Sequence, residues 1–216
     1  MTTVVELIAR VRQACDMEHT DFVSDTEIVG YLDVANGGVY NAIIKANEAY
    51  FIEATSVSVV NSLASLPATC YKLVSVESLI NGQLVTLRRF NFAESNRHNT
   101  TGVSLYQTQG YKYCIYGNTL MFKPENTNIS ATIYYIPYAP EITIASTLDL
   151  PIANWYEYLI YSAAAECLAK QESDTAYCMK RMDSAMKDVM EQVANRDESS
   201  PESVVNIYRQ NTWDYY

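Results

Sequence analysis

Few side chains in this sequence could do chemistry, and they are widely separated. Its imidazoles and thiols belong to two histidines and five cysteines: His19, His98, Cys15, Cys70, Cys114, Cys167 and Cys178. His19 lies among acidic residues in Asp16–Asp21, which could hold a metal ion or transfer a proton, but a solvated loop accounts for it more simply. We therefore expect His19 to lie in a solvated loop, and we expect His98 to be exposed as well.

The cysteines do not form a metal-binding or redox motif. Their number is odd, none are arranged as Cys-x-x-Cys, and each is in an apolar or helical stretch. We therefore expect buried, reduced thiols. The alternative is a cysteine nucleophile, which would need a thiol with a lowered pKa.

Sequence patterns of catalysis and cofactor binding are also absent. The chain contains no Gly-x-Ser-x-Gly, His-Glu-x-x-His or Gly-x-x-x-x-Gly-Lys motif, and its acidic loop lacks the spacing of a calcium site. Asp183 and Asp188 fall on the outer face of a predicted helix, where carboxylates are usually solvated. The sequence predicts no catalytic residue, no cofactor-binding residue, no metal ligand and no enzymatic activity.

The composition is that of a folded, acidic protein. Of the 216 residues, 49% are hydrophobic and 19% charged, and the formal net charge is −10. The adjacent basic pairs are Arg88-Arg89 and Lys180-Arg181, so sequence-specific binding of nucleic acid is not expected. Because no apolar run could span a membrane and no signal peptide opens the sequence, we expect the protein to stay where it is made.

Tyrosine is unusually frequent, with 18 residues against five phenylalanines. Tyrosine is enriched at protein interfaces, because its ring buries a large area while its hydroxyl can still form a hydrogen bond. A half-exposed β surface would favour the same residue. The sequence leaves both interpretations open.

Two helices are predicted at the start of the chain. Thr3 with Glu6, and Ser24 with Glu27, match the capping box, and apolar residues follow each pair at helical spacing. Gly37-Gly38 interrupts the apolar stripe of the second helix. The pair predicts either a bend or the close approach of another backbone.

The middle of the chain alternates between apolar and polar residues, as β-strands do. Asn81-Gly82 and Gly117-Asn118 each separate two such runs and predict two hairpins. A further strand, Ile129–Ile136, ends at Pro137. The polar stretch Glu94–Thr101 is expected to be an exposed loop or a short helix.

Helices are predicted again after Pro151. The first contains Trp155 to Cys167 at helical spacing, and the second follows Ser173-Asp174 and ends near Asn195. The regularly spaced apolar residues of the second helix are expected to form its buried face. They are Met179, Met182, Met186, Val189, Met190 and Val193.

The final segment, residues 197–216, has a different composition. An acidic spacer, Asp197–Glu202, precedes apolar and aromatic residues that a solvated tail does not need. We expect a docking strand instead of a frayed end. The candidate binding residues are Pro201, Val204, Val205, Ile207, Tyr208, Trp213, Tyr215 and Tyr216.

This order of elements predicts an α+β fold. We expect a helical bundle of four main helices, two N-terminal and two C-terminal, with an inserted antiparallel β-rich domain and an extended C-terminal arm. The expected boundaries are 1–53 for the N-terminal helices, 54–148 for the β-rich domain, 149–196 for the C-terminal helices and 197–216 for the arm.

Several segments, taken in order, resemble the head-to-tail adaptor proteins of tailed phages, also called connectors, head completion factors or tail accessory factors. The segments are Leu7–Arg12, Asp25–Ile28, Leu32–Asn36, Tyr40, Leu66–Val76, Tyr116–Pro124, Ile133–Pro137 and Tyr161–Lys170, with a tail that opens at Pro201. The resemblance covers nearly the whole chain.

The resemblance implies a structural virion protein of the neck, made in the host bacterial cytoplasm. Such adaptors form a ring of twelve copies beneath the portal protein, through which DNA can pass. They extend a C-terminal arm onto the portal and present their lower face to tail or nozzle proteins. By this resemblance, the candidate binding residues between Pro201 and Tyr216 are portal-binding residues.

Two alternatives stay open. Another virion ring component, such as a tail-completion or baseplate protein, would share the acidic, tyrosine-rich composition without binding a portal. A small cytoplasmic hydrolase would need a reactive cysteine that the sequence does not reveal.

Overall fold

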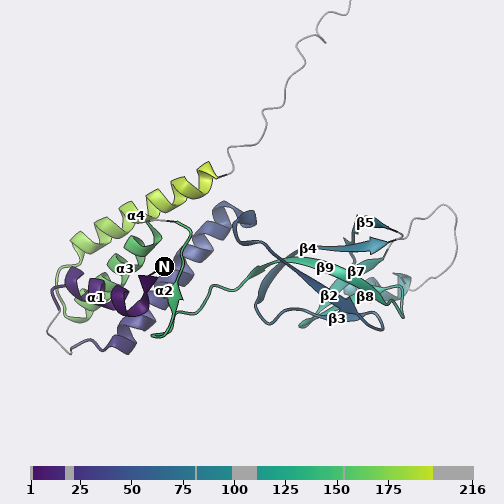
Figure 1. The fold of residues 1–216 in the computed structure, drawn as a ribbon, viewed down its shortest axis with the longest axis horizontal. Coiled ribbons are helices and arrows are strands. Elements are labelled where there is room, and N and C mark those ends of the chain that lie inside the picture. Colours follow the sequence, from purple (N-terminus) through teal and green to yellow (C-terminus); the bar gives the residue numbers. More distant parts are fainter. Residues whose placement is uncertain (1, 18–21, 81, 99–110, 153, 197–216) are drawn as a thin grey trace, which may run out of the picture. The chain divides into compact units, whose positions relative to one another are not determined.

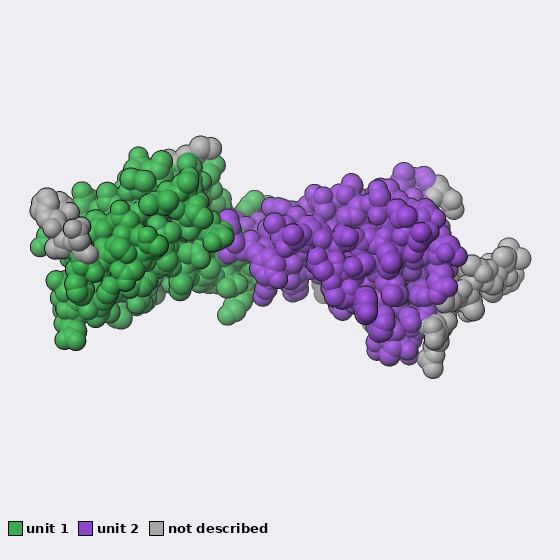
Figure 2. Space-filling view, turned by 90° about the horizontal axis from the view of Figure 1, so that it is seen from below, with its two compact units in different colours: residues 1–47, 141–216 green, residues 48–140 purple. Residues whose placement is uncertain are grey.

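The structure is a computed structural model that describes residues 2–17, 22–80, 82–98, 111–152 and 154–196. The chain divides into two compact units, which Figure 2 colours separately. We call residues 1–47 with 141–216 the helical unit, and residues 48–140 the β unit. The predicted mixed α+β class is confirmed.

Four α-helices form the described part of the helical unit, as Figure 1 shows in outline. They are α1 (Val4–Ala14), α2 (Asp25–Ala46), α3 (Trp155–Lys170) and α4 (Ala176–Asn195). Helix α3 packs against each of the other three. Both ends of the chain are therefore needed to build one hydrophobic core.

The first two helices begin at the predicted capping boxes. Thr3 Oγ1 accepts a hydrogen bond from the Glu6 N–H at 3.3 Å, and Glu6 Oε2 accepts one from the Thr3 N–H at 3.1 Å. Ser24 and Glu27 repeat the arrangement at 3.3 and 3.0 Å. Each box satisfies amide groups that the first helical turn leaves without partners.

The helical unit also contains a short two-stranded sheet that the sequence did not predict. Strand β1 (Thr2–Thr3) pairs antiparallel with β10 (Thr147–Leu148). Nearby, Asp33 Oδ1 in α2 accepts a hydrogen bond from the Ile142 N–H at 2.8 Å. These bonds hold the segment that begins at Glu141 within the helical unit.

The unit boundaries differ from the expected ones. The β unit is Glu48–Pro140, whereas the sequence placed the β-rich domain at 54–148. At its start, the 3₁₀ helix η1 (Glu48–Phe51) carries a carboxylate that pairs with Lys72 Nζ at 2.9 Å. At its end, residues 141–148 belong with the helices because their backbone bonds to α2 and β1.

Helix α2 continues through Gly37-Gly38. A Cβ built on Gly37 would meet no atom within 4 Å, and one on Gly38 would lie 3.9 Å from Tyr158 Oη. The predicted approach of another backbone is wrong for the described residues. The glycines are tolerated in a helix whose opposite face is buried.

The predicted buried face of α4 is confirmed at Val189 and Val193 but not at its methionines. Its fully buried residues are Cys178, Ala185, Val189 and Val193, whereas Met179 is 51% exposed. Helix α4 packs against α3, whose buried Ala163, Ala164 and Ala165 allow close helix packing. The other three methionines of α4 are half-buried, as flexible thioethers can be.

Two four-stranded sheets form the described part of the β unit. One has the order β2-β9-β4-β5, and the other β3-β8-β7-β6. The strands are β2 (Glu53–Val59), β3 (Leu63–Ser65), β4 (Cys70–Ile80), β5 (Gln83–Thr86), β6 (Arg88–Arg89), β7 (Lys112–Tyr116), β8 (Thr119–Lys123) and β9 (Ile129–Pro137).

Both predicted hairpins are present. Strands β4 and β5 pair antiparallel on either side of Asn81-Gly82, and β7 and β8 pair on either side of Gly117-Asn118. Gly82 has φ +80° and Gly117 has φ +58°, values at which glycine avoids the strain of a Cβ. Asn81 lies outside the described residues.

The β unit is antiparallel except at one edge. Strand β6 runs parallel to β7, with Arg88 beside Lys112 and Arg89 beside Tyr113. The 3₁₀ helix η2 (Phe92–His98) follows β6 and packs against β7, and it contains the described part of the predicted polar stretch. A parallel neighbour requires a crossover, and the sequence pattern did not reveal it.

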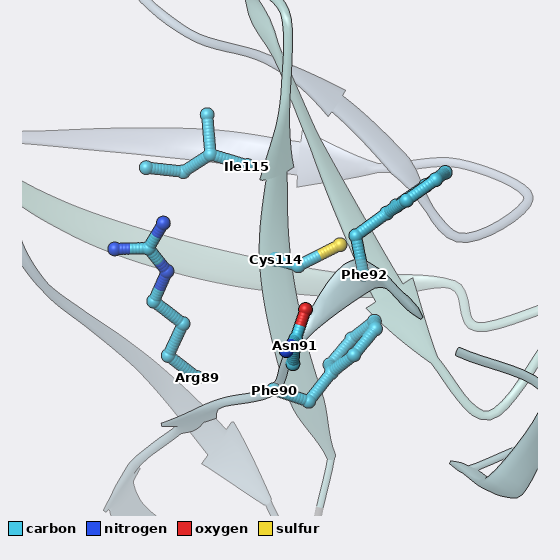
Figure 3. Close-up of a pocket in the computed structure, with 6 residues that line it drawn as sticks. All are labelled: Arg89, Phe90, Asn91, Phe92, Cys114 and Ile115. Carbon is cyan, nitrogen blue, oxygen red and sulfur yellow. The ribbon is translucent and has the colours of Figure 1, made fainter. Parts of the chain in front are cut away.

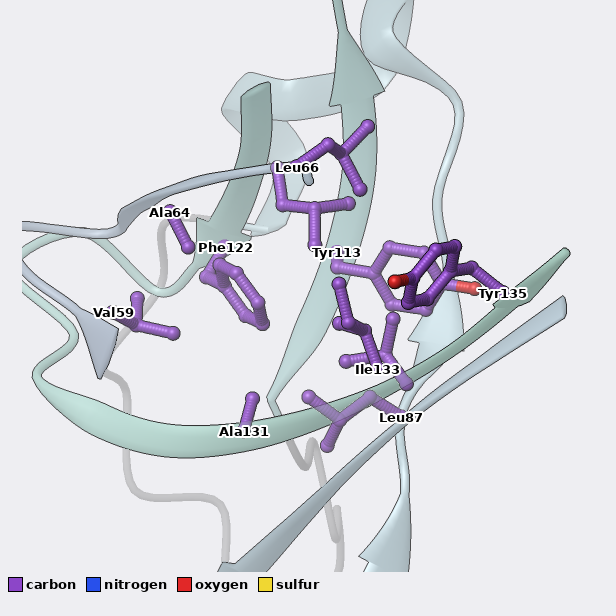
Figure 4. Close-up of a cluster of buried hydrophobic side chains, with 11 residues drawn as sticks. Val59, Ala64, Leu66, Leu87, Tyr113, Phe122, Ala131, Ile133 and Tyr135 are labelled. Carbon is purple, nitrogen blue, oxygen red and sulfur yellow. The ribbon is translucent and has the colours of Figure 1, made fainter. Parts of the chain in front are cut away.

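Side chains from both sheets form one hydrophobic cluster (Figure 4). Phe122 from β8 and Ile133 from β9 are fully buried in it, and Tyr113 and Tyr135 are nearly so. Tyr135 Oη donates to Glu53 Oε2 at 3.1 Å, so its polar end is satisfied. This cluster lies wholly within residues 48–140.

Candidate interaction surface

The predicted portal-binding residues, all between Pro201 and Tyr216, lie outside the residues that the structure describes. The extended arm to which they were assigned lies outside them as well, and so does His19. The structure does place His98, the two helical carboxylates and the five cysteines.

His98 is half-buried, so the prediction that it is exposed is wrong. Its ring centroid lies 5.2 Å from that of Phe90, and Lys112 Nζ lies 3.4 Å from its Nδ1. The packing of η2 on β7 brings these residues together. In the helical unit, Asp183 and Asp188 are exposed, as predicted, and Asp188 accepts a hydrogen bond from Asn154 at 2.7 Å.

All five thiols are free, and burial is the main cause that raises the pKa of each. The effect is largest at Cys167, whose pKa is about 12. Cys70 is half-buried and the other four are buried, so the expected burial is confirmed except at Cys70. A neutral thiol is a poor nucleophile, because the thiolate is the reactive form.

A hollow of about 460 Å³ lies at the β6 edge of the second sheet (Figure 3). Its lining comes from the end of β6, the start of η2 and the middle of β7: Arg89, Phe90, Asn91, Phe92, Cys114 and Ile115. The hollow therefore follows the part of β7 beyond the point where its short neighbour β6 ends.

Side chains line the hollow on both sides of β7. Figure 3 shows Arg89 and Ile115 on one side of the strand and Cys114 and Phe92 on the other. Beyond them Phe92 stacks on Tyr116, with ring centroids 5.3 Å apart and an interplanar angle of 12°. Phe92 is 48% exposed and Tyr116 is 58% exposed, so this stacked pair presents apolar surface to the solvent.

The backbone edge of β7 is open at Ile115. The Tyr113 carbonyl faces β6 and accepts a hydrogen bond from the Phe90 N–H at 2.9 Å. Alternate residues of a strand direct their N–H and C=O to the same edge, so the polar groups of Ile115 face this edge too. Within the described part of the chain, nothing pairs with them.

The charge beside the hollow is positive. Arg88 and Arg89 are both exposed, and neither makes an ion pair with a described residue. Arg89 and Lys123 partly offset the effect of burial on the pKa of Cys114. In the sequence, the signal of this surface is a basic pair followed by Phe90-Asn91-Phe92, and a basic pair alone does not distinguish a protein contact from a nucleic-acid contact.

The abundant tyrosines have two kinds of environment. Tyr156 is half-buried, and its hydroxyl donates to the Leu148 carbonyl at 2.8 Å and accepts from the Leu150 N–H at 3.0 Å. Tyr71 and Tyr138, in contrast, are exposed and form an edge-to-face pair 5.6 Å apart. The exposed pair, with Tyr71 on β4, fits the half-exposed β surface, and the interface interpretation stays a prediction.

None of the described helices is both long and apolar enough to cross a membrane.

Comparison with known proteins gives the family. A search of the curated proteins finds no match. The family model of the SU10 adaptor protein matches residues 2–205, which include every described helix and strand and the start of the final segment. The chain belongs to the SU10 adaptor protein family.

Proposed function

We propose that this protein forms a ring beneath the portal of a tailed phage and links the capsid to the tail. The family match over residues 2–205 carries the proposal, because it makes the chain a phage structural adaptor and a component of the virion. The ring of twelve copies, its place in the neck, the passage of DNA through it and the contact with tail or nozzle proteins are the proposed details.

The division of the chain supports an adaptor that must bind partners on separate surfaces. Helix α4 ends at Asn195, and the chain continues directly into segment 197–216 with its apolar and aromatic residues. The β unit has a core of its own and carries exposed apolar and basic side chains. One segment can thus bind the portal while the β unit contacts other proteins.

Imaging of virions tests the proposed ring. We expect one copy of this chain per portal subunit, arranged head-to-tail around the axis of the portal, because such contacts close into a ring. A two-fold dimer inside the particle, or isolated single copies, would contradict the proposal. Absence from the particle would contradict the family assignment itself.

Truncation tests the proposed portal contact. A chain that ends at Arg196 keeps every described helix and strand, so we expect the same thermal unfolding as the full chain but no binding to purified portal rings. As a matched control, Ser199 and Ser200 in the spacer are replaced by glycine, which should leave binding intact. Equal binding by the truncated chain would remove the arm from the interface.

We also propose that the protein is not an enzyme and needs no cofactor. The raised pKa of all five thiols argues against the alternative of a cysteine hydrolase. Free thiols also fit synthesis in the reducing host cytoplasm. Native-state alkylation should be slow at every cysteine, and one rapidly modified thiol near neutral pH would favour the hydrolase.

The other alternative is a different virion ring component, such as a tail-completion or baseplate protein. The family match favours the adaptor. A pull-down with purified portal protein separates the two, because only the adaptor should be retained.

A further inference from the structure

We propose that the open edge of β7 binds an extended, acidic segment of a second virion protein on the tail side of the ring. The segment would add a short strand to the second sheet of the β unit. This inference rests on the proposed function, because the proposed ring must bind a protein on its tail side. It goes further by naming the site, the binding mode and the chemistry of the partner.

The backbone supports strand addition at one position. The N–H and C=O of Ile115 face the edge that β6 leaves open, beyond the hydrogen bond from Phe90 to Tyr113. An added strand can pair with both groups through one of its own residues. Such pairing satisfies polar groups that have no partner among the described residues, and it is a common mode of peptide recognition.

The side chains on either side of β7 fit such a strand. Successive residues of a strand point to opposite faces, so one residue of the added segment would face Phe92 and Cys114 and the next would face Ile115 and Arg89 (Figure 3). The hollow of about 460 Å³ has room for a large side chain. The exposed Phe92–Tyr116 stack offers an aliphatic or aromatic side chain a flat apolar surface.

The positive charge beside the hollow favours an acidic partner. Arg88 and Arg89 are exposed and make no ion pair with a described residue, although the chain as a whole has a net charge of −10. Guanidinium groups bind carboxylates in well-defined geometry. The added segment should therefore carry Asp or Glu beside its apolar residue. The arm of a neighbouring copy is also acidic and apolar, but the proposed function assigns it to the portal.

A photo-crosslinking amino acid at position 92 identifies the occupant directly. Phe92 is replaced by p-benzoylphenylalanine, which keeps an aromatic ring at the hollow, and purified virions are irradiated and analysed by mass spectrometry. We expect a cross-link to an acid-containing segment of a tail-side protein. Cross-links only to residues 197–216 of another copy or to the portal would overturn the proposal, as would no cross-link at all.

Two variants test the contacts themselves. Arg89→Glu should lower the yield of tailed particles by about tenfold or more, since a reversed charge repels the partner. Arg10→Glu, which changes an exposed charge on α1, is the matched control and should leave the yield unchanged. Replacing Ile115 by its α-hydroxy acid deletes the N–H at the open edge while keeping the side chain, and it should also reduce the yield.

The composition of the particles separates the two proposals. If the edge of β7 is the docking site, Arg89→Glu particles retain this protein on the portal and lack only the tail-side partner. If this protein is missing from the heads, the portal contact has failed and the proposed function is in question. Normal tail content with Arg89→Glu, or binding of a synthetic 197–216 peptide at Ile115, would show that the occupant is wrong.

Discussion

The two units of this protein differ in which parts of the chain build their cores. The helical unit combines segments that come before and after the β unit in the sequence: Lys170 Nζ lies 2.6 Å from Glu27 Oε1, and β1 pairs with β10. The β unit completes its core within residues 48–140. A core built from one continuous segment can change its surface loops without disturbing the helices. The comparison therefore predicts that the core of the β unit forms independently of the helical core.

The largest expected effect tests whether the two cores are independent. Phe122→Ala empties a fully buried position of the β unit and should cost about 3–5 kcal/mol. Hydrogen exchange, measured peptide by peptide, should show lost protection in residues 48–140 and unchanged protection in α1–α4. Phe92→Ala, at a half-exposed ring, is the control and should cost about 1 kcal/mol. Equal loss in both units would show that they unfold together.

A second prediction concerns alkaline pH and the helical unit. Burial raises the pKa of the Cys167 thiol from 9.0 to about 12, so the unfolded chain loses this proton at a lower pH than the folded protein does. The stabilisation is complete below pH 9.0 and is lost as the pH rises toward about 12. Urea unfolding across this range should show falling stability of α1–α4.

Cysteine substitutions make that prediction specific. Cys167→Ala should reduce the loss of stability at high pH, since it removes the group that titrates. Cys70→Ala, at a half-buried thiol of the β unit, is the matched control. It should leave the dependence of the helical unit's stability on pH unchanged. An unchanged slope in Cys167→Ala would assign the effect to other groups, such as Tyr158, whose pKa burial also raises.

A third prediction compares serines in the two units. Ser24→Ala removes the side chain that caps α2 and should cost about 1 kcal/mol. Ser56→Ala, on an exposed position of β2, should change the stability by about 0.5 kcal/mol or less. The midpoints of urea unfolding measure both. Equal effects would mean that the capping box does not stabilise the helical unit.

The smallest effects should have opposite signs in the two units. Gly37→Ala places a methyl group where no atom lies within 4 Å and should stabilise α2 by about 0.5–1 kcal/mol. Gly82→Ala forces a Cβ into a hairpin turn with φ +80° and should destabilise the β unit by about 1 kcal/mol. Thermal unfolding should therefore move upward for the first variant and downward for the second.

Much of the local structure could be predicted from short stretches of sequence. The capping boxes at Thr3 and Ser24 determine where helices begin, because side chain and backbone lie within one turn of each other. The Asn81-Gly82 pair predicts a hairpin for a similar reason, since only the turn itself needs positive φ. The predicted burial of the α4 methionines is wrong, because spacing shows which residues share a face but not how deeply each is buried.

The candidate site could not be predicted, although its parts are visible in the sequence. Four of its residues are close in the sequence, namely Arg88, Arg89, Phe90 and Phe92. Cys114 and Ile115 are distant from them along the chain. Their meeting depends on the parallel pairing of β6 with β7 and on the crossover through η2. Neither feature has a side-chain pattern of its own.

The sequence by itself determined the α+β class, the starts of the first two helices, both hairpins and the resemblance to phage adaptors. Only the tertiary structure decided where one unit ends and the other begins, and which edge of a sheet stays open. The reason is physical: β1–β10 and β6–β7 are held by backbone hydrogen bonds, which nearly any residue can make. Such pairings leave no trace in residue type, so they appear only once the chain is folded.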